Sequence, residues 1–163
     1  MNTSAVLARA LIAYSVHEHQ DGAATHVQVT LQPRSCTVRD NGRGMGLDRD
    51  GYVVGLLEQL GGRRSDVALH GIGLAIIAMS SPMLRIESRR NGCRSAQTFV
   101  WGMAQGPVSS EPAAGATGTC VSFALPIEAP EIDVDEVLAQ VDRWRAAFPG
   151  LTIDISFNAQ HAL

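Results

Sequence analysis

The pattern of apolar and polar positions divides the chain into helical and strand-like segments. Apolar residues at helical spacing predict helices over residues 4–19, 52–60 and 134–147, and an apolar run over 75–79 follows two glycines. Alternation of apolar and polar residues predicts strands over 25–31, 36–39, 84–90, 94–101, 118–123 and 151–157. In sequence, this is one helix, two strands, two helices, three strands, a helix and a last strand.

The connecting segments complete this outline. Residues 105–117 are rich in Pro, Gly, Ser and Ala and are expected to form a loop. The acidic stretch 128–135 is expected to connect to the last helix, with Asp133 or Asp135 near its N-terminus. The order of elements predicts an α+β fold, a two-layer sandwich with helices on one face of a mixed sheet and a pocket between the layers.

Composition narrows the classes of function. The chain has 163 residues, 45% of them hydrophobic, which is enough to bury one core, so we expect a single domain over 1–163. A net charge of −3 gives no electrostatic case for nucleic-acid binding. No apolar run reaches membrane-spanning length, and Arg9 interrupts the short apolar stretch near the N-terminus, so we expect no membrane association, no signal peptide and a cytoplasmic location.

No metal site is expected. Cys36, Cys93 and Cys120 occur singly in strand-like segments and are interpreted as buried small apolar residues rather than disulfide partners or metal ligands. His17 and His19 are two positions apart on a predicted helix and therefore point to different sides.

The most informative motif is the strand end Asp40 followed by Asn41-Gly42-Arg43-Gly44-Met45-Gly46. Its glycines permit positive φ and leave a wall free of side chains for a flat ligand. A carboxylate beside such a wall suits an exocyclic amine such as that of adenine. The same residues are also common turn chemistry, so the motif alone does not distinguish a binding site from a turn.

Two further motifs extend the picture. The cluster His70-Gly71-Ile72-Gly73 precedes an apolar helix, whose N-terminal amides and dipole suit an anion such as a phosphate. Gly118 and Thr119 open an alternating strand with a hydroxyl. In this order, the three motifs resemble the nucleotide site of the GHKL ATPases, the superfamily of gyrase B, heat-shock protein 90, histidine kinases and MutL, and the likeness is greatest to the gyrase B ATPase domain.

The resemblance implies a GHKL (Bergerat) fold with a lid over about 61–70. It implies that Asp40 reads the ligand, assisted by Thr119, and that an adenine nucleotide is a possible ligand. The other residues it assigns to the ligand pocket are Gly42, Gly44, Met45, Gly71 and Gly73. The chain starts at the first core helix and stops after the last strand, so we expect neither the N-terminal dimerisation arm nor the transducer domain of gyrase B.

The first helix departs from the family pattern. Aligned through Asp40, the resemblance puts the Glu that activates water at Ala10 and the Asn that holds Mg²⁺ at Tyr14. Ala has no proton acceptor and a neutral phenol is a poor Mg²⁺ ligand, so we expect neither bound Mg²⁺ nor ATP hydrolysis. Glu18 matches a family Glu that pairs with the motif arginine, here Arg43. A shifted register would offer Glu18 as the base, but its partner four residues on is Gly22.

Three hypotheses for function remain. The first is a protein that binds a nucleotide, or a small molecule of that shape, without hydrolysing it. The second is a repurposed small-molecule enzyme of secondary metabolism, such as a cyclase, isomerase or hydrolase, with Tyr14, Glu18 and His70 as candidate catalytic residues. The third is an ATPase with a non-standard base. All three take a small-molecule ligand, and the sequence identifies no protein partner.

Overall fold

The computed structural model describes residues 2–45 and 68–159, and the side chains of 2–45 and 74–159. Three helices are present in this part of the chain: α1 (Thr3–Gln20), α2 (Ala68–Ser80) and α3 (Val134–Ala147). The strands are β1 (His26–Gln32), β2 (Ser35–Asp40), β3 (Met83–Arg90), β4 (Cys93–Val100), β5 (Met103–Ala104), β6 (Ser109–Pro112), β7 (Gly118–Ala124) and β8 (Thr152–Phe157).

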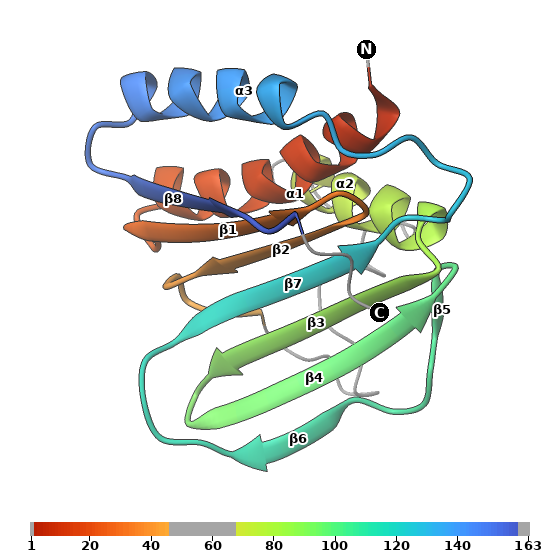
Figure 1. The fold of residues 1–163 in the computed structure, drawn as a ribbon. Coiled ribbons are helices and arrows are strands. Elements are labelled where there is room, and N and C mark those ends of the chain that lie inside the picture. Colours follow the sequence, from red (N-terminus) through yellow and green to blue (C-terminus); the bar gives the residue numbers. More distant parts are fainter. Residues whose placement is uncertain (1, 46–67, 160–163) are drawn as a thin grey trace.

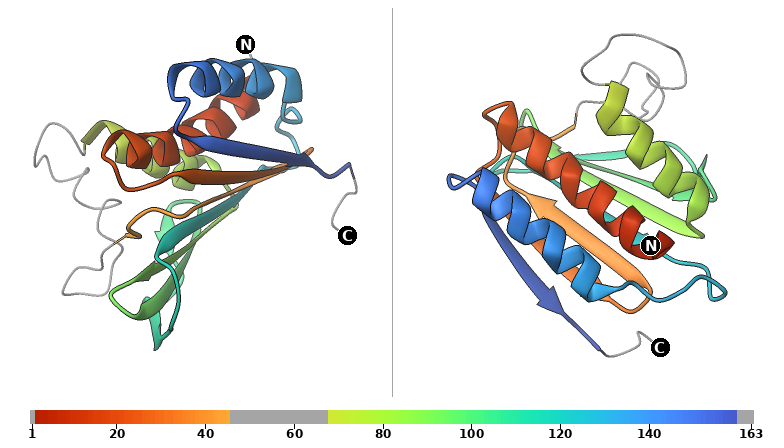
Figure 2. Two further views of the ribbon diagram at one scale, coloured as in Figure 1. Left: turned by 90° about the vertical axis from the view of Figure 1, so that its left-hand side faces the viewer. Right: turned by 90° about the horizontal axis from the view of Figure 1, so that it is seen from above.

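The strands form one mixed sheet in the order β5-β4-β3-β7-β2-β1-β8, and β6 pairs with β4. Strand β8 runs parallel to β1, whereas the other pairings are antiparallel. The three helices lie over one face of the sheet, with α1 between α2 and α3 (Figures 1 and 2). The predicted α+β fold with helices on one face is therefore confirmed and is compatible with the GHKL fold.

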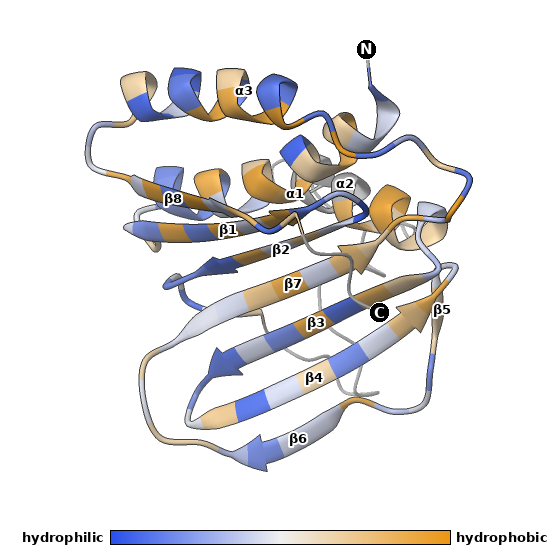
Figure 3. Ribbon diagram, in the orientation of Figure 1, coloured by the Kyte–Doolittle hydropathy of each residue, from blue (hydrophilic) through white to orange (hydrophobic). Residues whose placement is uncertain are grey.

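The core lies between these two layers. Helix α1 turns a stripe of small and apolar residues toward the sheet, and the strands alternate between apolar residues facing the helices and polar residues facing away (Figure 3). The largest fully buried side chains come from all parts of this interface: Leu11, Ile12, Val27, Leu31, Ile77, Leu84, Ile86, Val121, Phe123 and Val137. Their burial supplies the main driving force for folding.

Side-chain caps define two helix starts. The Asn2 carboxamide accepts a hydrogen bond from the Ala5 amide at 2.8 Å and caps α1. Asp133 caps α3 by accepting from the Glu136 amide at 3.1 Å, which confirms the expected acid at this helix start. None of the helices in the described ranges is both long and apolar enough to cross a bilayer.

The prediction of a loop over 105–117 is wrong for the middle of this segment. Residues 109–112 form β6, which pairs antiparallel with the outer edge of β4. All four residues of β6 are exposed, so the strand has no alternating burial that a sequence pattern could reveal. Backbone hydrogen bonding to a neighbouring edge decides this element rather than the burial of side chains.

The expectation of three buried cysteines is also wrong. Cys36 is fully buried on β2, but Cys93 is exposed at the start of β4, beside the β3–β4 turn, and Cys120 is half-buried on the uncovered face of β7. All three are free thiols. Strand position alone does not bury a cysteine, because all three described helices lie on the other face of the sheet.

Candidate functional site

Asp40 ends β2 and turns its carboxylate toward α1. Oδ2 accepts a 2.7 Å hydrogen bond from the Ser15 hydroxyl, and Oδ1 accepts a 2.9 Å bond from the Gly42 amide. Asp40 pairs with Thr119 across β2 and β7, and both side chains are buried on the helix-covered side. The structure thus brings together the acid and the hydroxyl residue that the sequence motifs selected.

Burial governs the acidity of Asp40. With only 5% of the residue exposed, desolvation raises the pKa of the carboxyl above its ordinary value, and hydrogen bonds from Ser15 and Gly42 oppose the shift. A carboxylate offers about four acceptor positions; Ser15 and Gly42 occupy two of them, and the Thr119 backbone amide is a third donor. Asp40 therefore retains acceptor capacity for a ligand, and burial strengthens any hydrogen bond made there.

Gly42 and Gly44 are the two motif glycines that the structure describes, and a side chain is excluded at each for a different physical reason. Gly44 has φ of 77°, and a Cβ there would collide with the backbone oxygen of Arg89. Gly42 does not adopt positive φ, contrary to expectation. Instead it leaves space, since a Cβ would lie 3.0 Å from Asp40 Oδ1 and 3.2 Å from Glu18 Oε2. Gly46 lies outside the described residues.

The turn is held against the sheet by Ser88 of β3. The Ser88 hydroxyl accepts from the Met45 amide at 2.7 Å and donates to the Met45 carbonyl at 2.8 Å. Both residues are buried, so these bonds are shielded from water. Ser88 occupies an inward position of an otherwise apolar strand face, which is the sequence signal that could have identified it.

Glu18 and Arg43 form the predicted ion pair. Arg43 Nη2 lies 3.1 Å from Glu18 Oε1 and also 3.0 Å from Asp21 Oδ2, a second partner that sequence reasoning missed. Glu18 has a 13% exposed side chain, and its other oxygen, Oε2, is buried without a hydrogen-bond partner beside Gly42. One carboxylate oxygen at the edge of the motif thus remains available to a donor.

Tyr14 lies on the same side of α1 as Glu18. Burial raises the pKa of its phenol well above the usual range, and the negative charges of Glu18 and Asp40 raise it further, whereas Arg43 and Arg90 oppose them. The phenol therefore keeps its proton at physiological pH and offers a hydrogen-bond donor among acceptors. Ala10, one helical turn earlier, is partly buried and packs against the core.

Asn41 ties the motif to the start of β1. Its side-chain oxygen accepts from the amides of Thr25 and His26, each at 2.9 Å, and its nitrogen donates to the Thr25 hydroxyl at 2.9 Å. These bonds occupy the Asn41 carboxamide, which consequently has a structural role. In the sequence, Asn41 indicates only a turn, so its bonds to the start of β1 could not be predicted.

The second glycine cluster differs from the expectation. Helix α2 begins at Ala68, so Gly71 and Gly73 lie inside its first two turns rather than before it. The unpaired amides of a helix belong to its first turn, which places Gly73 beyond them. Three expectations lie outside the described residues: the side chain of His70, residues 61–67 of the lid, and the helix over 52–60.

The described residues contain no group of three or more His, Cys, Asp or Glu side chains arranged to hold a metal ion. His19 has a local structural role instead. A ring nitrogen, Nδ1, lies 2.7 Å from the Ala24 carbonyl, and the ring packs edge-on against Phe148.

Comparison with known proteins supports a distant relationship. The chain is 37% identical over 100 residues to the B subunit of DNA topoisomerase 4 from Haemophilus influenzae, and the match covers 53% of this chain and 16% of that protein. No protein-family model matches the sequence. The B subunits of such topoisomerases have the GHKL fold, so the match, the element order and the Asp40–Thr119 pairing together support a gyrase B-like, GHKL relationship for this chain.

Proposed function

We propose that this protein binds an adenine nucleotide, or a small molecule of similar shape, in the pocket around Asp40 and does not hydrolyse it. The observation that carries the proposal is the environment of Asp40: a buried carboxylate with unused acceptor positions, next to Gly42 and paired in register with Thr119. A donor such as an exocyclic amine would occupy the remaining acceptor capacity of this carboxylate, and Glu18 Oε2 beside Gly42 is a buried acceptor without a hydrogen-bond partner.

The chemistry at the first helix supports binding without hydrolysis. Hydrolysis of a terminal phosphate needs a group that orients and deprotonates water and a metal ion that screens phosphate charge. Ala10 supplies no such group, and Tyr14 offers a protonated phenol. Because the Glu18 and Asp40 carboxyl groups lie here and the Tyr14 phenol is neutral, the site favours the base and sugar of a nucleotide over its negatively charged phosphates.

The alternative of a repurposed enzyme receives less support. A phenol whose pKa is raised far above neutral is a weak general acid, because efficient acids have a pKa near the working pH. Glu18 is engaged by Arg43 through one oxygen, although its second oxygen is unpartnered. A hydrogen-bonding role in ligand recognition accounts for both residues without a reaction.

Isothermal titration calorimetry with adenosine, ADP and ATP, each with and without Mg²⁺, and with guanosine as the base control, tests the proposal. We expect binding of adenine compounds, no gain from Mg²⁺, and a loss of roughly tenfold or more in Asp40→Asn, which removes a charged acceptor. The matched control is Asp154→Asn, an exposed carboxylate on β8. Absence of adenine binding, or equal affinity in Asp40→Asn, would contradict the proposal.

A further inference from the structure

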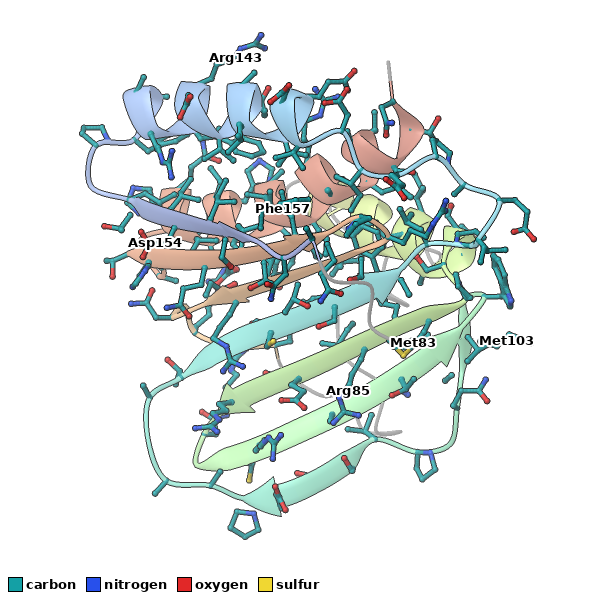
Figure 4. The ribbon with its side chains drawn as sticks, viewed as in Figure 1. Met83, Arg85, Met103, Arg143, Asp154 and Phe157 are labelled. Carbon is teal, nitrogen blue, oxygen red and sulfur yellow. The ribbon has the colours of Figure 1, made fainter. Side chains whose placement is uncertain are left out.

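The sheet face on which no described helix lies is strongly charged. Alternate residues of β2, β3, β4 and β7 point away from the helices, and Arg85 projects from this face in Figure 4. The pairing register puts Arg39 of β2 beside Cys120 of β7, and Cys120 beside Glu87 of β3. Arg89 of β3 pairs with Gly118, two positions before Cys120 on the same strand.

The acidic groups of this region are already paired. Glu87 contacts Arg85 at 2.8 Å and Arg94 at 3.0 Å, and these guanidinium groups hold the pKa of its carboxyl below the usual value. Glu111 of β6 pairs with Arg94 at 3.3 Å. The negative charges of Glu87 and Glu111 therefore balance the positive charges of Arg85 and Arg94.

Arg39 and Arg89 are left without an acidic partner. Both are exposed, and neither forms an ion pair with any residue that the structure describes. Arg39 and Arg89 therefore contribute two positive charges that no described acid pairs with, on a chain whose overall formal charge is −3.

These two arginines line one hollow. It has a volume of about 230 Å³, and its wall includes Arg39, Glu87, Arg89, Thr117 and Cys120. Asp40, Asn41 and Thr119 border it as well. Gly118 keeps the β7 backbone close to β2, since a Cβ there would collide with the Asp40 backbone oxygen. The segment before β7 also borders the hollow, and Arg89 Nη1 passes near Gly115.

We propose that this hollow binds a small ligand through a phosphate group, held between the guanidinium groups of Arg39 and Arg89. Guanidinium groups match the oxygens of a phosphate with paired, charge-assisted hydrogen bonds. Two uncompensated positive charges complement the charge of a phosphate near neutral pH. Thr117 contributes a neighbouring hydroxyl.

The dimensions favour a small ligand over a whole nucleotide or a macromolecule. Pockets for drug-sized molecules have volumes of roughly 300–1,000 Å³, and this hollow is smaller. Glu87 borders it as well, but its charge is already compensated by Arg85 and Arg94, so it offers limited repulsion to an anion.

The hollow adjoins the Asp40 site, because Asp40 and Thr119 border it as well. Asp40 and Thr119 point toward the helices, whereas Arg39 and Cys120 point the opposite way because successive side chains of a strand alternate. The probes distinguish the two proposals, because adenosine carries no phosphate and inorganic phosphate carries no base.

Titration with inorganic phosphate, followed by backbone amide NMR at low ionic strength, tests the inference. Sodium chloride of matched ionic strength controls for general screening. We expect saturable shifts at residues 116–120 and at Arg39 with phosphate and not with chloride. Arg39→Gln and Arg89→Gln should each weaken binding roughly tenfold or more, because each removes charged hydrogen bonds. The matched control is Arg143→Gln: Arg143 is also an exposed arginine and projects from α3 away from the sheet (Figure 4).

A second measurement uses the thiol in the hollow. In a Cys93→Ser background, where Cys36 is fully buried, alkylation reports mainly on Cys120. Phosphate should slow alkylation of Cys120 with the same concentration dependence as the NMR shifts, and this protection should disappear in Arg89→Gln. Shifts that do not saturate, shifts equal to those caused by chloride, or full binding in both arginine variants would overturn the proposal.

Discussion

The Ser15 hydroxyl donates a 2.7 Å hydrogen bond to Asp40 Oδ2, and both residues are buried. This bond joins the middle of α1 to the end of β2, at the point where the chain enters the glycine motif. Asp40 thus has two roles: it is the candidate ligand-reading group, and it is an internal acceptor that positions the first helix over the sheet.

Ser15→Ala tests the structural role. The change leaves a buried carboxylate oxygen without its donor, so we expect a loss of about 1–3 kcal/mol in the free energy of unfolding. Removal of this donor should also raise the pKa of Asp40 further, because the hydrogen bond favours the ionised form. Urea unfolding measures the first effect. Ser122→Ala, which removes a partly buried hydroxyl from the uncovered face, is the control, and equal losses in both variants would contradict the assignment.

The pH dependence of stability should report the burial of Asp40. Its folded pKa is raised above the ordinary 3.8, so its contribution to stability is complete below that pH and is lost as pH rises through the folded pKa. Asp40→Asn removes this titration. The stability of the wild type relative to Asp40→Asn should therefore decline as the pH rises above about 4. Denaturant unfolding at several pH values checks this, and a pH-independent difference would show that the carboxyl titrates normally.

A double-mutant cycle on Glu18 and Arg43 measures the ion pair beside the motif. The Arg43 side chain is 52% exposed, so we expect a coupling of no more than about 1 kcal/mol, reduced by added salt. Asp21 offers Arg43 a second partner, so the coupling energy between Arg43 and Glu18 should increase in an Asp21→Asn background. The exposed pair Arg145–Asp142 provides a reference. Zero coupling in both the wild-type and the Asp21→Asn background would show that the Glu18–Arg43 pair does not stabilise the site.

The purified protein should show no Mg²⁺-dependent ATP turnover above background. Ala10 provides no base, and the Tyr14 phenol provides no ligand suited to Mg²⁺. Phosphate-release assays with and without EDTA test this expectation. Turnover that depends on Mg²⁺ and disappears in Glu18→Gln would contradict it, and would assign Glu18 as the base instead.

Tyr14→Phe separates ligand binding from catalysis. The ring volume is retained, so thermal stability should change little, and a binding protein should lose at most the contribution of one hydrogen bond to ligand affinity. If the native ligand reveals a reaction, a fall of roughly 10²-fold in rate with unchanged affinity would instead assign the hydroxyl to the chemistry. The three variants Tyr14→Phe, Glu18→Gln and His70→Ala together test the enzyme alternative.

Local sequence patterns were sufficient for most elements. Helical spacing over 4–19 and 134–147 and alternation along the strands reflect burial of one face, and the structure contains each of these elements with small shifts at the ends. The motif order also placed Asp40 and Thr119 at one site. Their identity reflects chemistry that the residues carry themselves: a carboxylate at a strand end and a hydroxyl at a strand start.

Other features depended on which segments meet in space. Three features each arise from pairing between different segments: the strand β6, the inward roles of Ser15 and Ser88, and the lack of an ion pair between Arg39 or Arg89 and any described acid. A buried serine and an exposed one have the same local signal, and an arginine lacks an acidic partner only once the sheet register has assigned the nearby acids to others. Local residue patterns therefore determined the elements and the motif, whereas the tertiary structure decided which polar groups are paired and which remain available for a ligand.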